Sequence, residues 1–309
     1  MKTFAKYLIA LFCLVFIVDK GLGYIFNKLY LQNRVGDTGG KINYYLSLQA
    51  PDLLIMGSSR SIYVIPDSFN VSCFNLGHAG MVDDFHTGLL HVLIAHNKAP
   101  KTILLQIDPE TYCSLDTDKY EKSIQNLLYY YGKDELVTEY INGISFHERF
   151  FYLFHLFRFN GRAFNLIGNA LKSYRSFKPN NGYDPLPASP EDSASTVNLA
   201  TKVNRDGPLV ISRMKYLFRF IELCKQNNIK LIAFTSPLYA NHFQEPAAFD
   251  SILRLNNIPY INYLKLGLPS VENKPYLWKD PVHLNSIGAT YASGDLARRF
   301  KQLTGVQNK

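Results

Sequence analysis

Short apolar runs alternate with longer amphipathic segments along most of this chain of 309 residues. The clearest run is Leu53–Met56, in which four successive apolar residues are typical of a strand buried on both faces of a parallel sheet. Comparable runs predict further strands at 71–75, 102–107, 230–235 and 258–263. Apolar residues at helical spacing predict helices at 83–97, 208–227, 244–255 and 285–303.

This alternation predicts an α/β fold, with a five-stranded parallel sheet and helices on both of its faces. After the first strand, the segment that ends near Pro66 is predicted to be a short helix or a loop. Residues 112–207 do not follow the alternation. We interpret them as an insert within a sheet domain that covers 51–309.

The insert is rich in tyrosine and phenylalanine, and its first part is predicted to be helical. Four phenylalanines recur at helical spacing, and basic residues lie among or after them: Phe146, Phe150, Phe154 and Phe157, with Arg149, Arg158, Arg162, Lys172 and Arg175. The favoured interpretation is that this stripe packs on the sheet domain or forms a small core. The alternative is a basic, aromatic helix that lies on a membrane surface or docks a membrane partner. Residues 178–208 turn polar and proline-rich, which predicts a flexible loop or lid.

The amino terminus predicts a single membrane anchor at 1–27. Between Phe4 and Val18 only Lys6 is charged, and Gly21–Phe26 could extend this run to the ~20 residues of a membrane span. A cleaved signal peptide that ends before Tyr24 is the alternative. The favoured location is a bacterial inner membrane, crossed once, with the globular part extracytoplasmic, in the periplasm. Residues 28–50 are predicted to form a polar juxtamembrane connector.

Composition limits the classes of function. An apolar content of 47% with 14% aromatic residues excludes a disordered chain. The formal charge of +8 favours an anionic neighbourhood such as phospholipid or an acidic glycan. No zinc-type cysteine spacing or nucleic-acid-binding motif is present in the sequence, so neither a metal, nor another cofactor, nor a nucleic-acid partner is expected. The four cysteines are widely spaced and imply no disulfide framework.

Three distant segments carry the candidate chemistry. Gly57-Ser58-Ser59 follows the first strand, where α/β proteins place their sites, although such a turn is commonly a simple serine cap. Asp280 and His283 lie just before the last helix, and with a serine they can complete a triad in which histidine takes the serine proton. Between these segments lies a turn with two glycines, at 75–80.

Together, in this order, the three segments resemble the blocks of the SGNH (GDSL-type) hydrolase superfamily, over roughly 50–110 and 208–305. The resemblance implies an SGNH/flavodoxin-like three-layer sandwich with Ser59 as nucleophile and Asp280 and His283 as its partners. It also implies an oxyanion hole formed by the N–H of Ser59, at a helix start, and the N–H of Gly80. Glycine suits the latter place because the backbone must approach the substrate closely.

The third block departs from the family. Gly-x-Asn-Asp is expected after the third strand, but here Asp108-Pro109 follows it. An ionised aspartate only accepts hydrogen bonds, so a donor worth on the order of 3 kcal/mol of barrier is missing or comes from elsewhere. Arg60 could bind an anionic substrate or pair with a carboxylate such as Asp108. His78 is a further candidate for substrate contact, although a structural role is favoured.

Two hypotheses follow from this resemblance. The first is a serine esterase or O-acyltransferase that acts on an ester or acylated glycan of a cell-envelope polysaccharide through an acyl-enzyme. In this it resembles SGNH-like proteins of envelope acylation, which have one amino-terminal helix and work beside a membrane-bound O-acyltransferase partner. The second hypothesis is a non-catalytic, glycan-binding or scaffold module of an envelope assembly machine, which Asp108 keeps open.

Overall fold

The structure is a computed structural model, which describes residues 2–36, 39–113, 122–171, 180–200, 208–239 and 245–305. The chain forms two compact units. One consists of Met1–Leu48 and Glu121–Lys178, and the other of Gln49–Tyr120 and Pro179–Lys309. The predicted insert is therefore divided between the two units. Lys172 and Arg175, grouped above with its aromatic stripe, lie outside the described residues.

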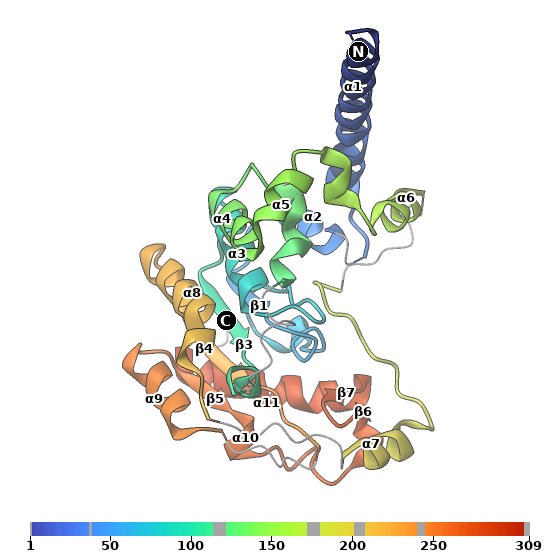
Figure 1. Cartoon of the computed structure of the whole chain (residues 1–309). Coiled ribbons are helices and arrows are strands. Elements are labelled where there is room, and N and C mark those ends of the chain that lie inside the picture. Colours follow the sequence, from blue (N-terminus) through green and yellow to red (C-terminus); the bar gives the residue numbers. More distant parts are fainter. Residues whose placement is uncertain are drawn as a thin grey trace. The chain divides into compact units, whose positions relative to one another are not determined.

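A parallel sheet of five strands, in the order β2-β1-β3-β4-β5, forms the centre of the second unit (Figure 1). The strands are β1 (Leu53–Met56), β2 (Cys73–Asn75), β3 (Thr102–Gln106), β4 (Lys230–Thr235) and β5 (Tyr260–Asn262). All their pairings are parallel, which confirms the predicted sheet. The strand order reverses at β1, because β2 lies on one side of it and β3 on the other. In α/β sheets a crevice for ligands forms at the carboxyl ends of the strands at such a point.

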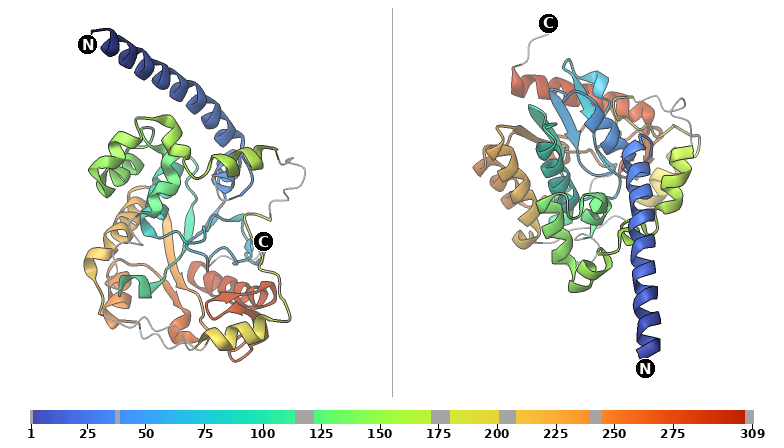
Figure 2. Two further views of the ribbon diagram at one scale, coloured as in Figure 1. Left: turned by 45° about the vertical axis from the view of Figure 1, so that its right-hand side comes forward. Right: turned by 90° about the horizontal axis from the view of Figure 1, so that it is seen from above.

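Helices cover both faces of this sheet (Figure 2). On one face, α11 (Ser286–Thr304) contributes Leu296 and Phe300 to a buried apolar cluster that includes Leu53 and Ile55 of β1. Since side chains alternate along a strand, the next residues of β1 point to the opposite face. There α3 (Asp83–Ala95) packs against α8 (Lys215–Gln226). The shorter elements are α7 (Asp192–Ala200), α9 (Ala247–Leu255), α10 (Tyr263–Leu266), η1 (Pro66–Ser68), η2 (Pro109–Tyr112), η6 (Ile211–Met214) and η7 (Pro275–Leu277).

The segment after β1 is not helical, so the expectation that the Ser59 N–H lies at a helix start is wrong. Successive turns form instead, in which the N–H of Ser61 donates to Ser58 O and the N–H of Val64 donates to Ser61 O, both at 3.0 Å. The local sequence explains this, because β-branched residues are frequent here and the residue before Pro66 is disfavoured in a helix.

Two other elements were not predicted. Part of the polar segment at 178–208 is an ordered helix, α7, in which Asp192 and Thr196 are buried. A two-stranded antiparallel hairpin, β6 (Trp278–Asp280) with β7 (His283–Leu284), precedes α11. Both elements bear on the candidate site, as described below.

The first unit is built around α1 (Lys2–Gln32), which is long and apolar enough to cross a membrane, judged by length and composition. This helix continues past the predicted end of the anchor at residue 27, and part of the predicted connector forms α2 (Gly40–Ser47). The other elements are η3 (Ser123–Tyr130), α4 (Glu135–Ile144), α5 (Phe146–Phe151), η4 (His155–Phe159) and α6 (Ala163–Leu171).

A small aromatic core joins the carboxyl-terminal half of α1 to η4 and α6. Tyr30, Phe159 and Leu166 are buried at its centre, and Phe26 stacks on Phe159 with ring centroids 5.4 Å apart. The prediction that the aromatic stripe of the insert packs into a core is nevertheless wrong for three of its four phenylalanines, because Phe146, Phe150 and Phe157 are exposed.

Candidate active site

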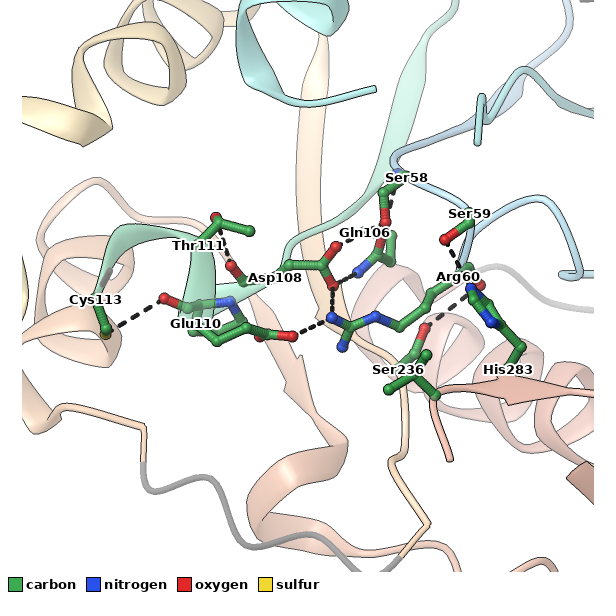
Figure 3. Close-up of polar contacts among 12 residues, drawn as sticks. Ser58, Ser59, Arg60, Gln106, Asp108, Glu110, Thr111, Cys113, Ser236 and His283 are labelled. Atoms are coloured by element: carbon green, nitrogen blue, oxygen red, sulfur yellow. Dashed lines mark hydrogen bonds and ion pairs between the residues drawn. The ribbon is translucent and has the colours of Figure 1, made fainter. Parts of the chain in front are cut away.

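Ser59, His283 and Asp280 come together at the carboxyl edge of the sheet. Ser59 Oγ lies 2.8 Å from His283 Nε2 (Figure 3), and His283 Nδ1 lies 2.7 Å from Asp280 Oδ2. This chain of contacts has the order serine, imidazole, carboxylate that a general base needs to take a proton from a hydroxyl. The two contacts have the distances that the sequence-based hypothesis requires.

The β6–β7 hairpin holds the imidazole and the carboxylate by local contacts. Asp280 Oδ1 accepts hydrogen bonds from the N–H groups of Val282, at 2.9 Å, and His283, at 3.0 Å. Burial raises the pKa of Asp280, but hydrogen bonds from the His283 ring and from these two N–H groups outweigh it and lower the pKa. Asp280 therefore stays ionised, as a group that orients and stabilises an imidazolium must.

Helix α7 fixes this hairpin on both of its flanks. Asp192 accepts a hydrogen bond from Asn285 Nδ2 at 3.0 Å, just after β7, and pairs with Lys279 Nζ of β6 at 2.9 Å. Thr196 Oγ1 donates to Trp278 O at 3.3 Å. The carboxyl of Asp192 is 98% buried, and its hydrogen bonds lower its pKa although burial opposes this. Asp192 thus joins the residues on either side of the Asp280–His283 pair.

Gln106, at the end of β3, determines the path of the serine loop. Its Oε1 accepts a hydrogen bond from the N–H of Ser58, at 3.1 Å, and lies 2.9 Å from Ser58 Oγ. Gly57 has a φ of 141°, and a Cβ there would lie 2.6 Å from the Cβ of Gln106. Glycine is required here both for its backbone conformation and for this close approach.

Asn75, at the end of β2, fixes the same loop from the other side. Its Nδ2 donates to Ser61 O at 2.7 Å and to Val64 O at 2.8 Å, and its Oδ1 accepts from the N–H of Gly77 at 2.9 Å. Asn75 is completely buried. The asparagine of the second sequence block therefore connects the serine loop to the following turn.

Arg60 is part of a buried ion-pair cluster. Its Nη2 lies 3.0 Å from Asp108 Oδ1 and also contacts Glu110 Oε1 (Figure 3). Burial alone would lower the pKa of Arg60, but these two carboxylates raise it. Arg60 is only 8% exposed. Of its two predicted roles, binding of an anionic substrate and pairing with Asp108, the structure contains the pairing with Asp108.

Asp108 is directed into this cluster. Ser58 Oγ donates to its Oδ2 at 2.7 Å, Gln106 Nε2 donates to its Oδ1, and Arg60 balances its charge. In Figure 3 the contact of the Ser59 hydroxyl is with His283, whereas the contacts of the Asp108 carboxylate are with Ser58, Gln106 and Arg60. The expectation that Asp108 stands where the family has its amide donor, facing an oxyanion, therefore needs correction, since its oxygens are engaged by the serine loop and Arg60.

The turn after β2 contains the other two candidates. Gly80 is exposed, with a φ of 71° in the left-handed region, which glycine adopts without strain. His78 is buried, and its N–H donates to Gly57 O at 3.0 Å, so it ties this turn to the start of the serine loop. His78 also contacts Phe85 edge to face. These contacts are structural, as the favoured sequence interpretation held.

Tyr63 adjoins the imidazole and was not predicted. Its ring meets that of His283 edge to face, with centroids 5.7 Å apart, and burial raises its pKa to about 12. Tyr63 also lines a small hollow, together with Val64 and with Val282 beside the imidazole. Its other walls are mostly apolar: Phe234, Pro237, Tyr263, Leu284, Ala289, Ala292 and Leu296, with Arg60, Ser236 and Ser293.

Sequence reasoning also missed Gln106, Glu110 and Asp192 as parts of the site. Gln106 is an uncharged polar residue near the end of a strand whose preceding residues, 103–105, are all apolar, which is a usable signal for a residue that faces the site. Nothing in the sequence indicated that Asp192 contacts the hairpin, since its partners there, Lys279 and Asn285, are more than eighty residues away in sequence. No group of His, Cys, Asp and Glu side chains that could hold a metal ion occurs within the described residues.

No family model matches the chain, and neither does any curated protein. Among solved structures, it is similar to a "putative acylhydrolase" from Bacteroides fragilis, at 13% identity and a TM-score of 0.41, over 84% of this chain and 93% of that one. It is also similar to a GDSL-like lipase from Bacteroides thetaiotaomicron, at 12% identity and a TM-score of 0.42, over 89% and 99%. At these values the likeness assigns no activity, so function has to be inferred from the site itself.

Proposed function

We propose that this protein is a membrane-anchored, SGNH-like serine esterase or O-acyltransferase. The observation that carries the proposal is the pair of contacts that join Ser59 Oγ to His283 Nε2 and His283 Nδ1 to Asp280, at 2.8 and 2.7 Å. Three residues from two distant segments meet in the order that nucleophilic catalysis requires. Their position at the switch point of a parallel sheet is where α/β proteins bind substrates.

In the proposed reaction, Ser59 Oγ attacks an ester carbonyl while His283 Nε2 takes its proton. The N–H groups of Ser59 and Gly80 donate to the oxyanion of the tetrahedral intermediate. Collapse of the intermediate breaks the bond to the leaving oxygen, which receives the proton from His283, and leaves the acyl group on Ser59. His283 then deprotonates water or an acceptor hydroxyl, whose oxygen attacks the acyl-enzyme. As the bond between the acyl carbon and Ser59 Oγ breaks, His283 returns the proton to Ser59 Oγ.

The altered third block favours transfer over hydrolysis within this proposal. Asp108 pairs with Arg60, which it shares with Glu110, and it offers an oxyanion no hydrogen-bond donor. Hydrolysis of a small ester would depend on the two backbone donors alone. A transferase tolerates a weak oxyanion hole better, because its docked donor and acceptor are held in position to react, and this positioning raises the rate.

The proposed substrate is an ester or acylated glycan of a cell-envelope polysaccharide, and the proposed partner is a membrane-bound O-acyltransferase. Support comes from α1, which is long and apolar enough for a span, and from the net charge of +8, which suits an anionic surface. In this proposal α1 anchors the protein in a bacterial inner membrane and the sheet unit lies on the periplasmic side.

A fluorophosphonate probe tests the proposed nucleophile on the full-length protein in detergent. Such a probe phosphonylates a serine that has an adjacent general base. We expect the wild type and S58A to be labelled and S59A and H283A to remain unlabelled, with the label found on the peptide that contains Ser59. Absence of label on wild type would favour the second hypothesis, a glycan-binding or scaffold module, for which the missing amide donor after β3 is the supporting observation.

A further inference from the structure

The first unit exposes a compact group of large apolar side chains. Five of them lie within a stretch of twelve residues, with exposed fractions of 66%, 55%, 46%, 62% and 43%: Phe146, Phe150, Phe151, Leu153 and Phe157. Phe146 packs against Phe150 and Phe151 stacks on Phe157, with centroids 5.1 and 5.0 Å apart. These side chains, called the aromatic patch below, thus form neighbouring pairs. Exposed apolar groups of this kind mark contact with another molecule or with a membrane.

The patch is tied to α1 by polar contacts at one level of that helix. Asp19 is 3% exposed, and its carboxylate accepts hydrogen bonds from the N–H groups of His155, at 2.8 Å, and Leu156, at 3.0 Å. Lys20 Nζ donates to Leu153 O at 2.8 Å. The backbone between Leu153 and Leu156 is therefore attached to α1 where its uninterrupted apolar run ends.

A close approach at the next turn of α1 supports this attachment. A Cβ at Gly23 would lie 2.4 Å from the Cβ of His155, so only glycine admits η4 at this distance. One turn further, Phe26 stacks on Phe159. The start of η4 is thus held rigidly at the level of Asp19–Gly23, rather than being a loop that hangs from the helix.

The apolar run of α1 is exposed up to this level. Phe16, Ile17 and Val18 are 44%, 67% and 46% exposed, as residues that face lipid would be. Lys20 Nζ lies 4.7 Å from the centroid of the Phe16 ring, so its positive charge lies at the end of the apolar run. Arg149, in the last turn of α5, adds an exposed cation within the patch.

From this continuity we propose that the aromatic patch inserts into the interfacial layer of the membrane that α1 crosses. The inference rests on the proposed membrane span, and it does not depend on catalysis. The patch and the apolar run of α1 would form one lipid-contacting surface, in which phenylalanine rings enter the acyl boundary and Lys20 and Arg149 meet anionic headgroups. A lipid surface is favoured over a protein partner because the patch is fixed next to the end of the span.

Tryptophan fluorescence tests this inference on the full chain in vesicles of phosphatidylcholine and phosphatidylglycerol. The chain has one tryptophan, Trp278, which is buried in the sheet unit, so its spectrum can be subtracted. We introduce one further tryptophan at the patch, in F150W or L153W. F12W, in the apolar run of α1, reports on the span, and L255W, at a position 83% exposed on α9, is the matched control outside this unit.

Lipids brominated near the headgroup end of the acyl chains then serve as quenchers. We expect the added emission of F150W and L153W to shift to shorter wavelength in vesicles and to lose most of its intensity with brominated lipid, while L255W does neither. If F12W is quenched but both patch variants emit as in water, the span exists and the inference is wrong. The aromatic patch would then be a contact surface for a protein partner or a second copy. If F12W is not quenched either, the proposed span itself has failed.

Discussion

The serine side and the histidine side of the candidate triad are held by different kinds of structure. Ser59 lies in a loop that Gln106 and Asn75 fix from the ends of two strands of the sheet. His283 lies on a two-stranded hairpin. Its contact with Asp280 and the hydrogen bond between Asp192 and Asn285 position it there. A change on the serine side therefore disturbs the sheet unit itself, whereas a change on the histidine side can misplace the imidazole and leave the fold intact.

The largest expected effect comes from removing either member of the central contact. S59A and H283A should each lower the rate of aryl acetate hydrolysis on the order of 10⁴-fold or to the detection limit, with similar values because the two residues act as one unit. Their double variant should be no worse than either alone. Steady-state hydrolysis measures this.

S58A is the matched control for that experiment, since it removes the neighbouring hydroxyl but not the nucleophile. If S58A abolished activity while S59A kept it, Ser58 would be the nucleophile and the contact with His283 would have another meaning. If S58A, S59A and H283A all hydrolysed the ester at the wild-type rate, the catalytic proposal would be wrong.

The next effect separates the two sides through stability. R60M leaves Asp108 and Glu110 buried without their cation, and breaking a buried pair in this way costs about 3–5 kcal/mol of unfolding free energy. We expect R60M with D108N and E110Q to recover part of the loss. Urea unfolding followed by the emission of buried Trp278 measures this.

The control is R254A, which removes an exposed pair with Asp250 on α9 and should cost about 0–1 kcal/mol. If R60M were as stable as R254A, the ion-pair cluster would not support the serine loop. The contrast between the serine side and the histidine side would then have no basis.

A smaller effect is expected from the histidine side. D192A removes the contacts of Asp192 with Lys279 and Asn285, so the hairpin can move. Misplacement of His283 should then lower kcat by up to about 100-fold. D192N keeps an oxygen that accepts from Asn285, so it should restore much of the rate. Because Asp192 acts through the hairpin, KM should change less than kcat.

T196A provides a comparison on the same helix, since it removes only the weaker contact to Trp278 O at 3.3 Å. D192A could instead lose stability, as monitored by Trp278 emission, in parallel with activity, and D192N could fail to recover either. Asp192 would then have a general structural role and would not be a residue that positions His283.

The same contrast explains what the sequence could predict. The strand at 230–235 was placed with its observed bounds, because buried strands leave continuous apolar runs. Asp280 and His283 were found because they are close in sequence and come just before a recognisable helix. The hairpin that carries them was missed, since strands of three and two residues are too short to show a period.

Contacts between distant residues were the hardest to predict. α7 was taken for a flexible segment because Asp-Ser-Ala-Ser-Thr is polar, although burial of Asp192 and Thr196 against the hairpin orders it. The pairing of Arg60 with Asp108 was one of two alternatives, and Glu110 as a second partner was not considered. Charge type is visible in a sequence, but which charges become buried together depends on tertiary packing.

The last prediction concerns pH and Asp83, at the start of α3. Burial raises the pKa of Asp83 to about 7, against an ordinary value of 3.8, although a hydrogen bond from Tyr112 opposes the shift. The folded protein therefore binds a proton more tightly than the unfolded chain, and this contribution to stability is complete below about pH 4 and is lost as the pH rises to about 7.

D83N cannot ionise and keeps an oxygen for Tyr112. Its stability relative to wild type should increase between pH 4 and 7 and level off above, as measured by urea unfolding with Trp278 emission at each pH. Taking the difference between the two proteins removes the opposite trend from carboxyls such as Asp280, whose lowered pKa makes stability rise with pH. A difference that does not vary with pH would mean that Asp83 is ionised in the folded protein across this range. Asp83 would then have to be solvated, and α3 would begin in contact with water and not packed against Tyr112.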